Sequence, residues 1–257
     1  GASQGIASLA GAVVGVAVVT GLGDAALQAW GWRLAIGLGA VILPIGYMLR
    51  RGLIETRHAP EPRAAHQPDK TTILSHWRIL SLGLGLITSA TIATYVTNYM
   101  TTFATTSLGM PTGVALGATV VVGAVTFLGS LAGGALSDRI GRRWLMIWPR
   151  LALILVAVPA FQLIVWRRDA VTLYLSIAVL VFLNGVASSP SITALTESTR
   201  KEVRSVAVAA CYATAVAIFG GSAQAIVLGM TRLTGSPLAR AWYMAGASVI
   251  GLVAAVL

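Results

Sequence analysis

One stretch of ten residues combines charges and glycines in a spacing that suits a conformational latch. It reads GALSDRIGRR and covers residues 134–143. Asp138 can accept hydrogen bonds from a neighbouring helix N-terminus or pair with an arginine, and the arginines can anchor at a membrane surface. We expect a compact turn between two apolar runs that acts as a gate; the alternative is an anchor that only fixes topology. The candidate gating residues are Gly134, Asp138, Arg139, Gly141, Arg142 and Arg143.

Polar side chains recur every three or four residues in the apolar segment 79–104, which places them on one face of a helix. They are Thr88, Thr91, Tyr95, Asn98, Thr102 and Thr105. A polar face directed at lipid is unfavourable, so this face should meet protein or water. We expect Thr91, Tyr95 and Asn98 to line a cavity for a polar metabolite, with Tyr99 beside them. Helix packing through threonine hydrogen bonds is the alternative.

Further candidates lie in two later apolar segments. Asn184 falls near the middle of segment 171–195, and Pro190 should bend that helix. Tyr212 and Gln224 flank the pair Gly220-Gly221, which permits bending or close packing. The full set of candidate substrate-binding residues is Thr91, Tyr95, Asn98, Tyr99, Asn184, Tyr212 and Gln224. The expected hinges or helix bends are at Pro190, Gly220 and Gly221.

Charged residues are nearly excluded from the apolar segments. Arg150 is the exception, and its burial costs about 2.5–3.5 kcal/mol on the insertion scale. It can snorkel to the membrane surface, or meet an anionic substrate or a carboxylate. All the acidic residues lie in loops or at segment ends, so the sequence offers no intramembrane carboxylate for proton coupling. Glu197 and Arg204 are the other charged residues of interest, and we expect no catalytic residue, metal site or cofactor.

Composition restricts the class of protein. The chain is 56% hydrophobic and only 10% charged, and its mean hydropathy is +0.83. A soluble domain carries about a quarter charged residues, so a soluble enzyme is excluded. The net charge of +10 indicates orientation in a lipid bilayer and not nucleic-acid binding, because the basic residues lie between apolar runs.

An all-α integral membrane protein is therefore expected, because backbone polar groups in lipid must be satisfied within a helix. Eight segments are long enough to cross a bilayer, at about 20 residues each. They are residues 3–22, 33–50, 79–104, 112–136, 144–165, 171–195, 205–230 and 239–257. The chain begins with Gly1 and is apolar almost at once, so we expect it to start inside a helix.

Basic residues predict the orientation of these segments. Most of the 18 Lys and Arg residues fall in loops 51–78, 137–143 and 196–204, which places those loops and both ends of the chain in the cytoplasm. Segment 51–76 is rich in prolines and charges and reads as a flexible linker between two spans and six.

The decapeptide resembles the loop signature of the major facilitator superfamily, G-x-L-S-D-R-x-G-R-R, at every fixed position. Other stretches look like the metabolite:proton symporter branch of that family, whose members import organic acids or betaine-like osmolytes. They are residues 4–5, 30–34, 99–109, 197–204, 212–221 and 234–243. The chain departs from the branch at Ala213, where Asn is usual, at Gln224, where Pro is usual, and between Glu197 and Arg204, where Phe-Pro is missing.

The resemblance implies an incomplete major-facilitator helical bundle that runs from about helix five to helix twelve. Residues 1–50 would be the last two helices of the N-terminal half, 51–76 the cytoplasmic linker and 77–257 the C-terminal six-helix half. It implies proton-coupled uptake of a small polar metabolite across a bacterial inner membrane, with the decapeptide latching one conformation. An inactive truncated transporter and, less favoured, an integral-membrane enzyme are the alternatives.

Overall fold

The described part of the chain is helical. The structure is a computed structural model that describes residues 1–26, 30–40, 42–52, 77–200 and 203–257. The linker predicted at 51–76 therefore lies almost wholly outside the described residues. Within the described ranges the α-helices are α1 (Ala2–Ala26), α2 (Trp32–Ala40), α3 (Ile42–Gly52), α5 (Trp77–Asn98), α6 (Met100–Thr106), α7 (Thr112–Ile140), α8 (Arg142–Arg167), α9 (Ala170–Ser198), α10 (Arg204–Thr214), α11 (Gly221–Thr234) and α12 (Ala239–Val256). A π-helix, η2 (Ala215–Gly220), joins α10 to α11.

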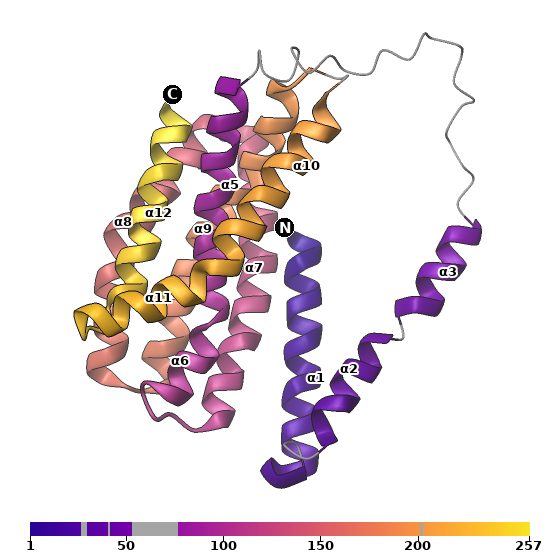
Figure 1. Cartoon of the computed structure of the whole chain (residues 1–257), viewed down its shortest axis with the longest axis vertical. Coiled ribbons are helices and arrows are strands. Elements are labelled where there is room, and N and C mark those ends of the chain that lie inside the picture. Colours follow the sequence, from indigo (N-terminus) through magenta and orange to yellow (C-terminus); the bar gives the residue numbers. More distant parts are fainter. Residues whose placement is uncertain (27–29, 41, 53–76, 201–202) are drawn as a thin grey trace.

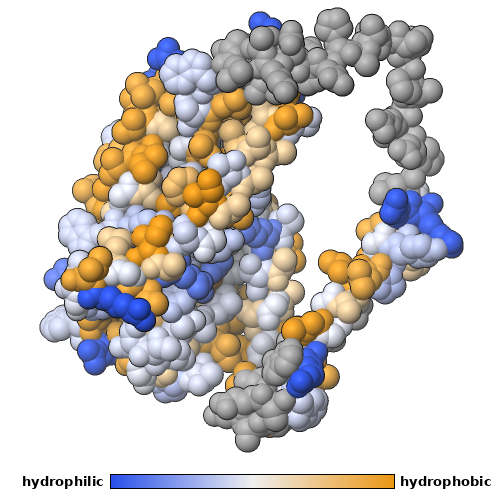
Figure 2. All heavy atoms as spheres, in the orientation of Figure 1, coloured by the Kyte–Doolittle hydropathy of each residue, from blue (hydrophilic) through white to orange (hydrophobic). Residues whose placement is uncertain are grey.

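Helices α5 to α12 gather into one bundle, with α1 along its side and α2 and α3 extending away (Figure 1). α9 packs against α5, α7 and α8, and α12 packs against α5 and α8. The core includes the fully buried rings of Phe103 and Phe161, whose centroids are 6.3 Å apart. Apolar side chains also cover much of the outer face of the bundle (Figure 2), as expected of a surface that faces lipid.

Seven helical stretches of the described residues are long and apolar enough to cross a membrane. They are Ala2–Leu22, Trp77–Thr106, Thr112–Ile140, Arg142–Arg167, Ala170–Ser198, Arg204–Thr234 and Ala239–Val256. These confirm seven of the eight expected segments. The remaining one, 33–50, corresponds to α2 and α3, which flank the undescribed residue 41 and are each too short to span a bilayer alone. That span stays a prediction.

Glycines bring α1 against α7. A Cβ atom on Gly5 would lie 2.5 Å from the backbone nitrogen of Phe127, and one on Gly123 would lie 2.6 Å from the backbone nitrogen of Leu9. Real side chains essentially never approach that closely, so the two backbones meet only because both positions lack a side chain.

The expected turn at residues 134–143 is wrong in extent, because most of it is helix. α7 continues to Ile140 and α8 begins at Arg142, so Gly141 alone separates them. Its φ of +97° and ψ of +145° lie in a region that is essentially confined to glycine. Alanine, leucine and arginine are good helix formers, and no residue before Gly141 ends the helix. α7 and α8 are therefore joined directly through this one residue, without a flexible loop.

Replacement of Gly141 by alanine should lower stability. A side chain at this φ and ψ costs about 1–3 kcal/mol, although nothing lies within 4 Å of the position to clash with a Cβ atom. We expect Gly141→Ala to lower the midpoint of thermal unfolding in detergent. The matched control is Gly246→Ala, at an exposed helical position with equal space, which should leave the midpoint unchanged or raise it. Equal midpoints for Gly141→Ala and the unmodified chain would contradict the argument.

Candidate functional site

The polar stripe along α5 does not face a single environment. Thr88 and Thr91 are buried, Tyr95 is partly buried, and Asn98 and Thr102 are exposed. The change follows from the chain itself, because α5 ends at Asn98 and α6 starts only at Met100. The helical face is therefore interrupted, and the stripe predicted from even spacing is split into a buried part and an exposed part.

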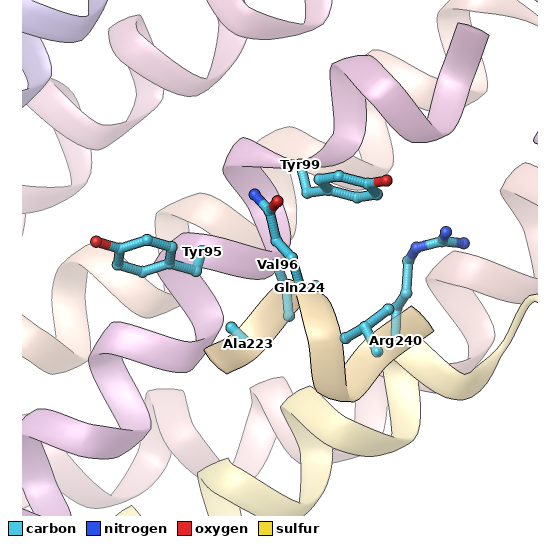
Figure 3. Close-up of a pocket in the computed structure, with 7 residues that line it drawn as sticks. Tyr95, Val96, Tyr99, Ala223, Gln224 and Arg240 are labelled. Carbon is cyan, nitrogen blue, oxygen red and sulfur yellow. The ribbon is translucent and has the colours of Figure 1, made fainter. Parts of the chain in front are cut away.

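A small pocket forms where α5, α11 and α12 meet (Figure 3). Tyr95 and Val96 come from α5, Tyr99 lies between α5 and α6, and Arg240 comes from α12. α11 contributes three residues, which are Ala223, Gln224 and Val227. The space between them accommodates about one water molecule. Three of the seven candidate substrate-binding residues, Tyr95, Tyr99 and Gln224, thus meet at one place.

The fourth polar residue of this pocket, Arg240, was not among the candidates. The sequence analysis gave it no role. Its side chain is only 5% exposed, and its guanidinium carbon lies 4.0 Å from the ring centroid of Phe103 and 5.7 Å from that of Tyr99. One signal was available: an arginine in the first turn of a helix opposes the helix dipole and needs a reason to be there.

The other candidates do not reach the pocket. The amide of Asn184 donates to the hydroxyl of Thr94 at 3.1 Å and ties α9 to α5. Thr91 is buried against Gly220, where a Cβ atom would lie 3.2 Å from the threonine methyl group. Asn98 and Tyr212 are exposed and do not line the pocket. Asn184 and Thr91 thus act in helix packing in this conformation.

The predicted bends fall into different structural settings. Gly220 ends η2, and a Cβ atom there would lie 2.7 Å from the ring of Tyr95, so this glycine permits close packing. Gly221 begins α11 and has no such neighbour. Pro190 is buried within α9. A π-bulge such as η2 is often found at functional sites and at helix bends, which favours a hinge at the start of α11.

Arg150 does not snorkel, contrary to the simpler interpretation of the sequence. It is 2% exposed and lies among α5, α8, α9 and α12. Its guanidinium donates to the carbonyl of Met146 at 2.9 Å and to the hydroxyl of Ser191 at 2.9 Å. A Cβ atom on Gly251 of α12 would lie 2.8 Å from its Nε atom. These partners hold the charge inside the bundle, so it has no need to reach the surface.

The charged residues around Gly141 form contacts among three helices. Arg142 pairs with Glu197 at the end of α9, and Arg143 donates to the carbonyl of Val256 near the end of α12 at 2.9 Å. Asp138 and Arg139 are exposed. Gly134 lies near Ser189 of α9, while Arg204 donates to the carbonyl of Thr199 at 3.4 Å. The decapeptide thus ties the helix ends of the bundle together and leaves Asp138 directed outward.

Long apolar helices that bury one bonded arginine and enclose a small pocket define a multi-pass helical membrane protein. A sequence profile of the Major Facilitator Superfamily matches residues 1–224. The chain belongs to the Major Facilitator Superfamily, as its decapeptide predicted.

Relatives of known activity lie in the branch that the sequence indicated. The chain is 33% identical to the citrate-proton symporter of Salmonella typhi over 98% of its own length and 59% of the relative. It is 31% identical to the alpha-ketoglutarate permease of Escherichia coli over 88% of its length and 52% of the relative, and 30% identical to the proline/betaine transporter of Salmonella typhimurium over 61% and 35%. The chain thus spans between 35% and 59% of the length of these three relatives.

The fold also matches a solved transporter structure. A bacterial homologue of the human lysosomal transporter Spinster, in an inward-facing and unoccupied conformation, superposes with a TM-score of 0.60 at 16% identity. The match covers 98% of this chain and 66% of the other. It confirms an incomplete major-facilitator bundle.

The partners of Arg150 yield a prediction about stability. In Ser191→Ala, the Nη2 atom of Arg150 retains only a 3.5 Å contact with the carbonyl of Leu86. Loss of a hydrogen bond to a buried charge costs about 1.5–3 kcal/mol, so the unfolding midpoint should fall. Ser205→Ala, which removes an exposed hydroxyl from α10, is the control and should not change it. A matching midpoint for both variants would show that Ser191 does not stabilise Arg150.

Proposed function

We propose that this chain forms the larger part of a secondary active transporter, not an enzyme, that takes up a small organic acid or betaine-like solute together with protons. The observation that carries the proposal is the similarity, over 98% of the chain, to two citrate-proton symporters at 33% and 31% identity. Such carriers bind substrate between two halves and expose the site alternately to each side. The other partners in the proposal are the lipid bilayer and the proton; nucleic acid is not one.

In this proposal residues 1–50 belong to the N-terminal half, 51–76 form the linker and 77–257 are the C-terminal half. α1 and α7 then come from different halves and meet through Gly5 and Gly123. A backbone contact of this kind allows two helices to slide or tilt past each other without side chains interlocking. It supports the assignment of α1 and α7 to the surface along which the halves move.

The proposed orientation places the Gly141 end of the bundle, both chain ends and the linker in the cytoplasm. The positive-inside rule supports it, since Arg139, Arg142 and Arg143 gather at that end of the described bundle. The pocket formed by α5, α11 and α12 then lies toward the outer side, because Arg240 is in the first turn of α12.

The decapeptide acts in this proposal as the latch between the halves. Arg142 and Arg143 are engaged within the bundle by Glu197 and the end of α12. Asp138 is exposed and accepts no hydrogen bond from the described residues. Its carboxylate is therefore free to accept from the N-terminal half when the cytoplasmic side closes.

Proton coupling needs an ionisable group that binds the proton inside the membrane. The described spans contain no carboxylate at such a depth. Asp138, Asp169 and Glu197 all lie at helix ends. We therefore assign the proton-binding group to a part of the carrier other than these described spans.

Uptake by the carrier that contains this chain tests the proposal. Its gene is read upstream of Gly1, the complete product is reconstituted in proteoliposomes, and a pH gradient that is acidic outside is imposed. Radiolabelled citrate, 2-oxoglutarate and glycine betaine are offered separately. We expect the gradient to drive accumulation of at least one of them and a protonophore to abolish it. A stop codon or frameshift upstream, or the absence of accumulation of all three, would instead favour an inactive remnant.

Substitution of Asp138 tests the latch. Asp138→Asn removes the charge and should reduce uptake at least tenfold, a loss of about 1.4 kcal/mol, while the protein still inserts in the membrane. Insertion is checked by the amount of folded carrier in purified membranes. Uptake equal to that of the unmodified carrier would reduce the decapeptide to a topology anchor.

The matched control for this substitution is Asp169→Asn at the other end of the bundle. The Thr172 hydroxyl and backbone N–H donate to Asp169 and hold its pKa below the usual value, so it is charged at neutral pH. Asparagine caps a helix as well as aspartate does. This variant loses one negative charge without losing the cap of α9, and its uptake should be unchanged.

A further inference from the structure

The guanidinium of Arg240 has hydrogen-bond donors without acceptors. Its Nε and Nη1 atoms are buried and bond to no atom of the described residues. No carboxylate lies within ion-pair distance of it there, whereas Arg142 at the other end of the bundle has Glu197. The hydroxyl of Tyr243, one turn further along α12, is also buried without a partner. Two orphaned polar groups thus stand on one face of α12.

Aromatic contacts do not compensate for this burial. The faces of Phe103 and Tyr99 attract the cation by about 0.5–2 kcal/mol. They supply no lone pair to the N–H groups, and a buried donor left unbonded is unfavourable. Arg150 shows the contrast, since the same bundle supplies it with a carbonyl and a hydroxyl. The surroundings of Arg240 therefore fit an acceptor that the described residues do not supply.

The pocket beside Arg240 indicates where that acceptor binds. Figure 3 shows the guanidinium beside the ring of Tyr99, with the amide of Gln224 across from them on α11. Once the pocket is wider, an acceptor between these side chains can meet a cation, an amide and a phenol. Such a set recognises a carboxylate, because Arg240 supplies charge and Gln224 and Tyr99 can donate hydrogen bonds.

Movement of α11 would admit such a group. In this conformation the pocket accommodates about one water molecule, which is less than a carboxylic acid needs. α11 buries only Ala223 and Val227, and it follows the π-helix η2 and the unobstructed Gly221. A helix that buries only two small side chains and follows a bulge can tilt away from α5 at low cost, and this tilt widens the pocket.

We propose that Arg240 binds a carboxylate of the transported substrate and so selects organic acids over betaine-like solutes. The inference rests on the proposed function, because it assigns the substrate class of that carrier. A betaine brings a quaternary ammonium along with its carboxylate, and the positive charge of Arg240 repels that ammonium in so small a pocket. An organic acid brings only negative charge, which Arg240 attracts.

Binding to the 257-residue chain itself tests this inference without transport. The chain is purified into nanodiscs, and its unfolding midpoint is measured with citrate, with the uncharged triamide of citrate, and with inorganic phosphate at equal ionic strength. Citrate should raise the midpoint, and the triamide and phosphate should not. A rise of equal size with phosphate would mean a general anion effect and would overturn the proposal.

Variants separate a direct contact from a structural role. Arg240→Gln should weaken citrate binding about 10- to 100-fold, as expected for lost bonds to a charged group. Arg240→Lys keeps the charge, and should fold and bind with intermediate affinity. Gln224→Leu, at an exposed position, should bind citrate several-fold more weakly at an unchanged midpoint without ligand. Arg232→Gln removes an exposed arginine from the last turn of α11 and should bind as the unmodified chain does.

The outcomes distinguish the two proposals. If Arg240→Gln binds citrate as the unmodified chain does, Arg240 does not bind the substrate. If Arg240→Gln does not fold, unchanged citrate binding in both Arg240→Lys and Gln224→Leu overturns the role of Arg240 instead. Absence of citrate binding to the unmodified chain, together with citrate uptake by the complete carrier, overturns it as well. If citrate binding depends on Arg240 but the complete carrier accumulates no solute, the site is supported and the proposed transport function is contradicted.

Discussion

The absence of water from the interior of a bilayer is the constraint on which this structure depends. A polar group inside the bundle must find its partner in the protein, because no solvent is there to supply one. The helices satisfy this for the backbone, and threonine and serine hydroxyls satisfy it by donating to carbonyls one turn earlier, as Thr97 and Ser248 do. Charged side chains are harder to accommodate, and the two buried arginines of the described chain differ in the hydrogen-bond partners they find.

Arg150 and Arg240 differ in what surrounds them. Arg150 lies where four helices converge, and three of them supply oxygen atoms to it. Arg240 lies at the start of a helix beside aromatic rings, and no atom of the described residues accepts from its Nε or Nη1 atom. One arginine therefore stabilises the packing of the bundle, and the other keeps two donors unbonded. Position in the fold, and not residue type, separates these two environments.

Much of the fold could be predicted because hydropathy reports burial in lipid directly. Seven of the expected spans agree with long helices, and the charged decapeptide lies at a helix junction. The details that failed depend on local geometry. The break at Tyr99 and the π-helix before Gly221 leave no mark in hydropathy, and the length of the turn at Gly141 depended on whether the residues before it remain helical.

The site was predictable only in part, for a related reason. The sequence selected Tyr95 by its place in the polar stripe, Tyr99 beside that stripe and Gln224 next to the Gly220-Gly221 pair, and these three residues line the pocket. It also selected Asn98 by spacing and Asn184 by its place in mid-span, since position within one helix cannot show which other helix lies opposite. Arg240 was missed because Tyr99 and Phe103, which lie far from it in the sequence, pack over it. Contacts between segments far apart in sequence decide such cases.

The single residue between α7 and α8 has a mechanical consequence. Two helices joined by a longer loop can move independently, but α7 and α8 are joined by one residue and must move together. Arg142 extends the coupling to α9 and Arg143 extends it to α12. A tilt of α7 against α1 would therefore be transmitted to four helix ends at once. The rim of the bundle at Gly141 would move as one unit, and a small displacement at a glycine contact would become a displacement of the whole rim.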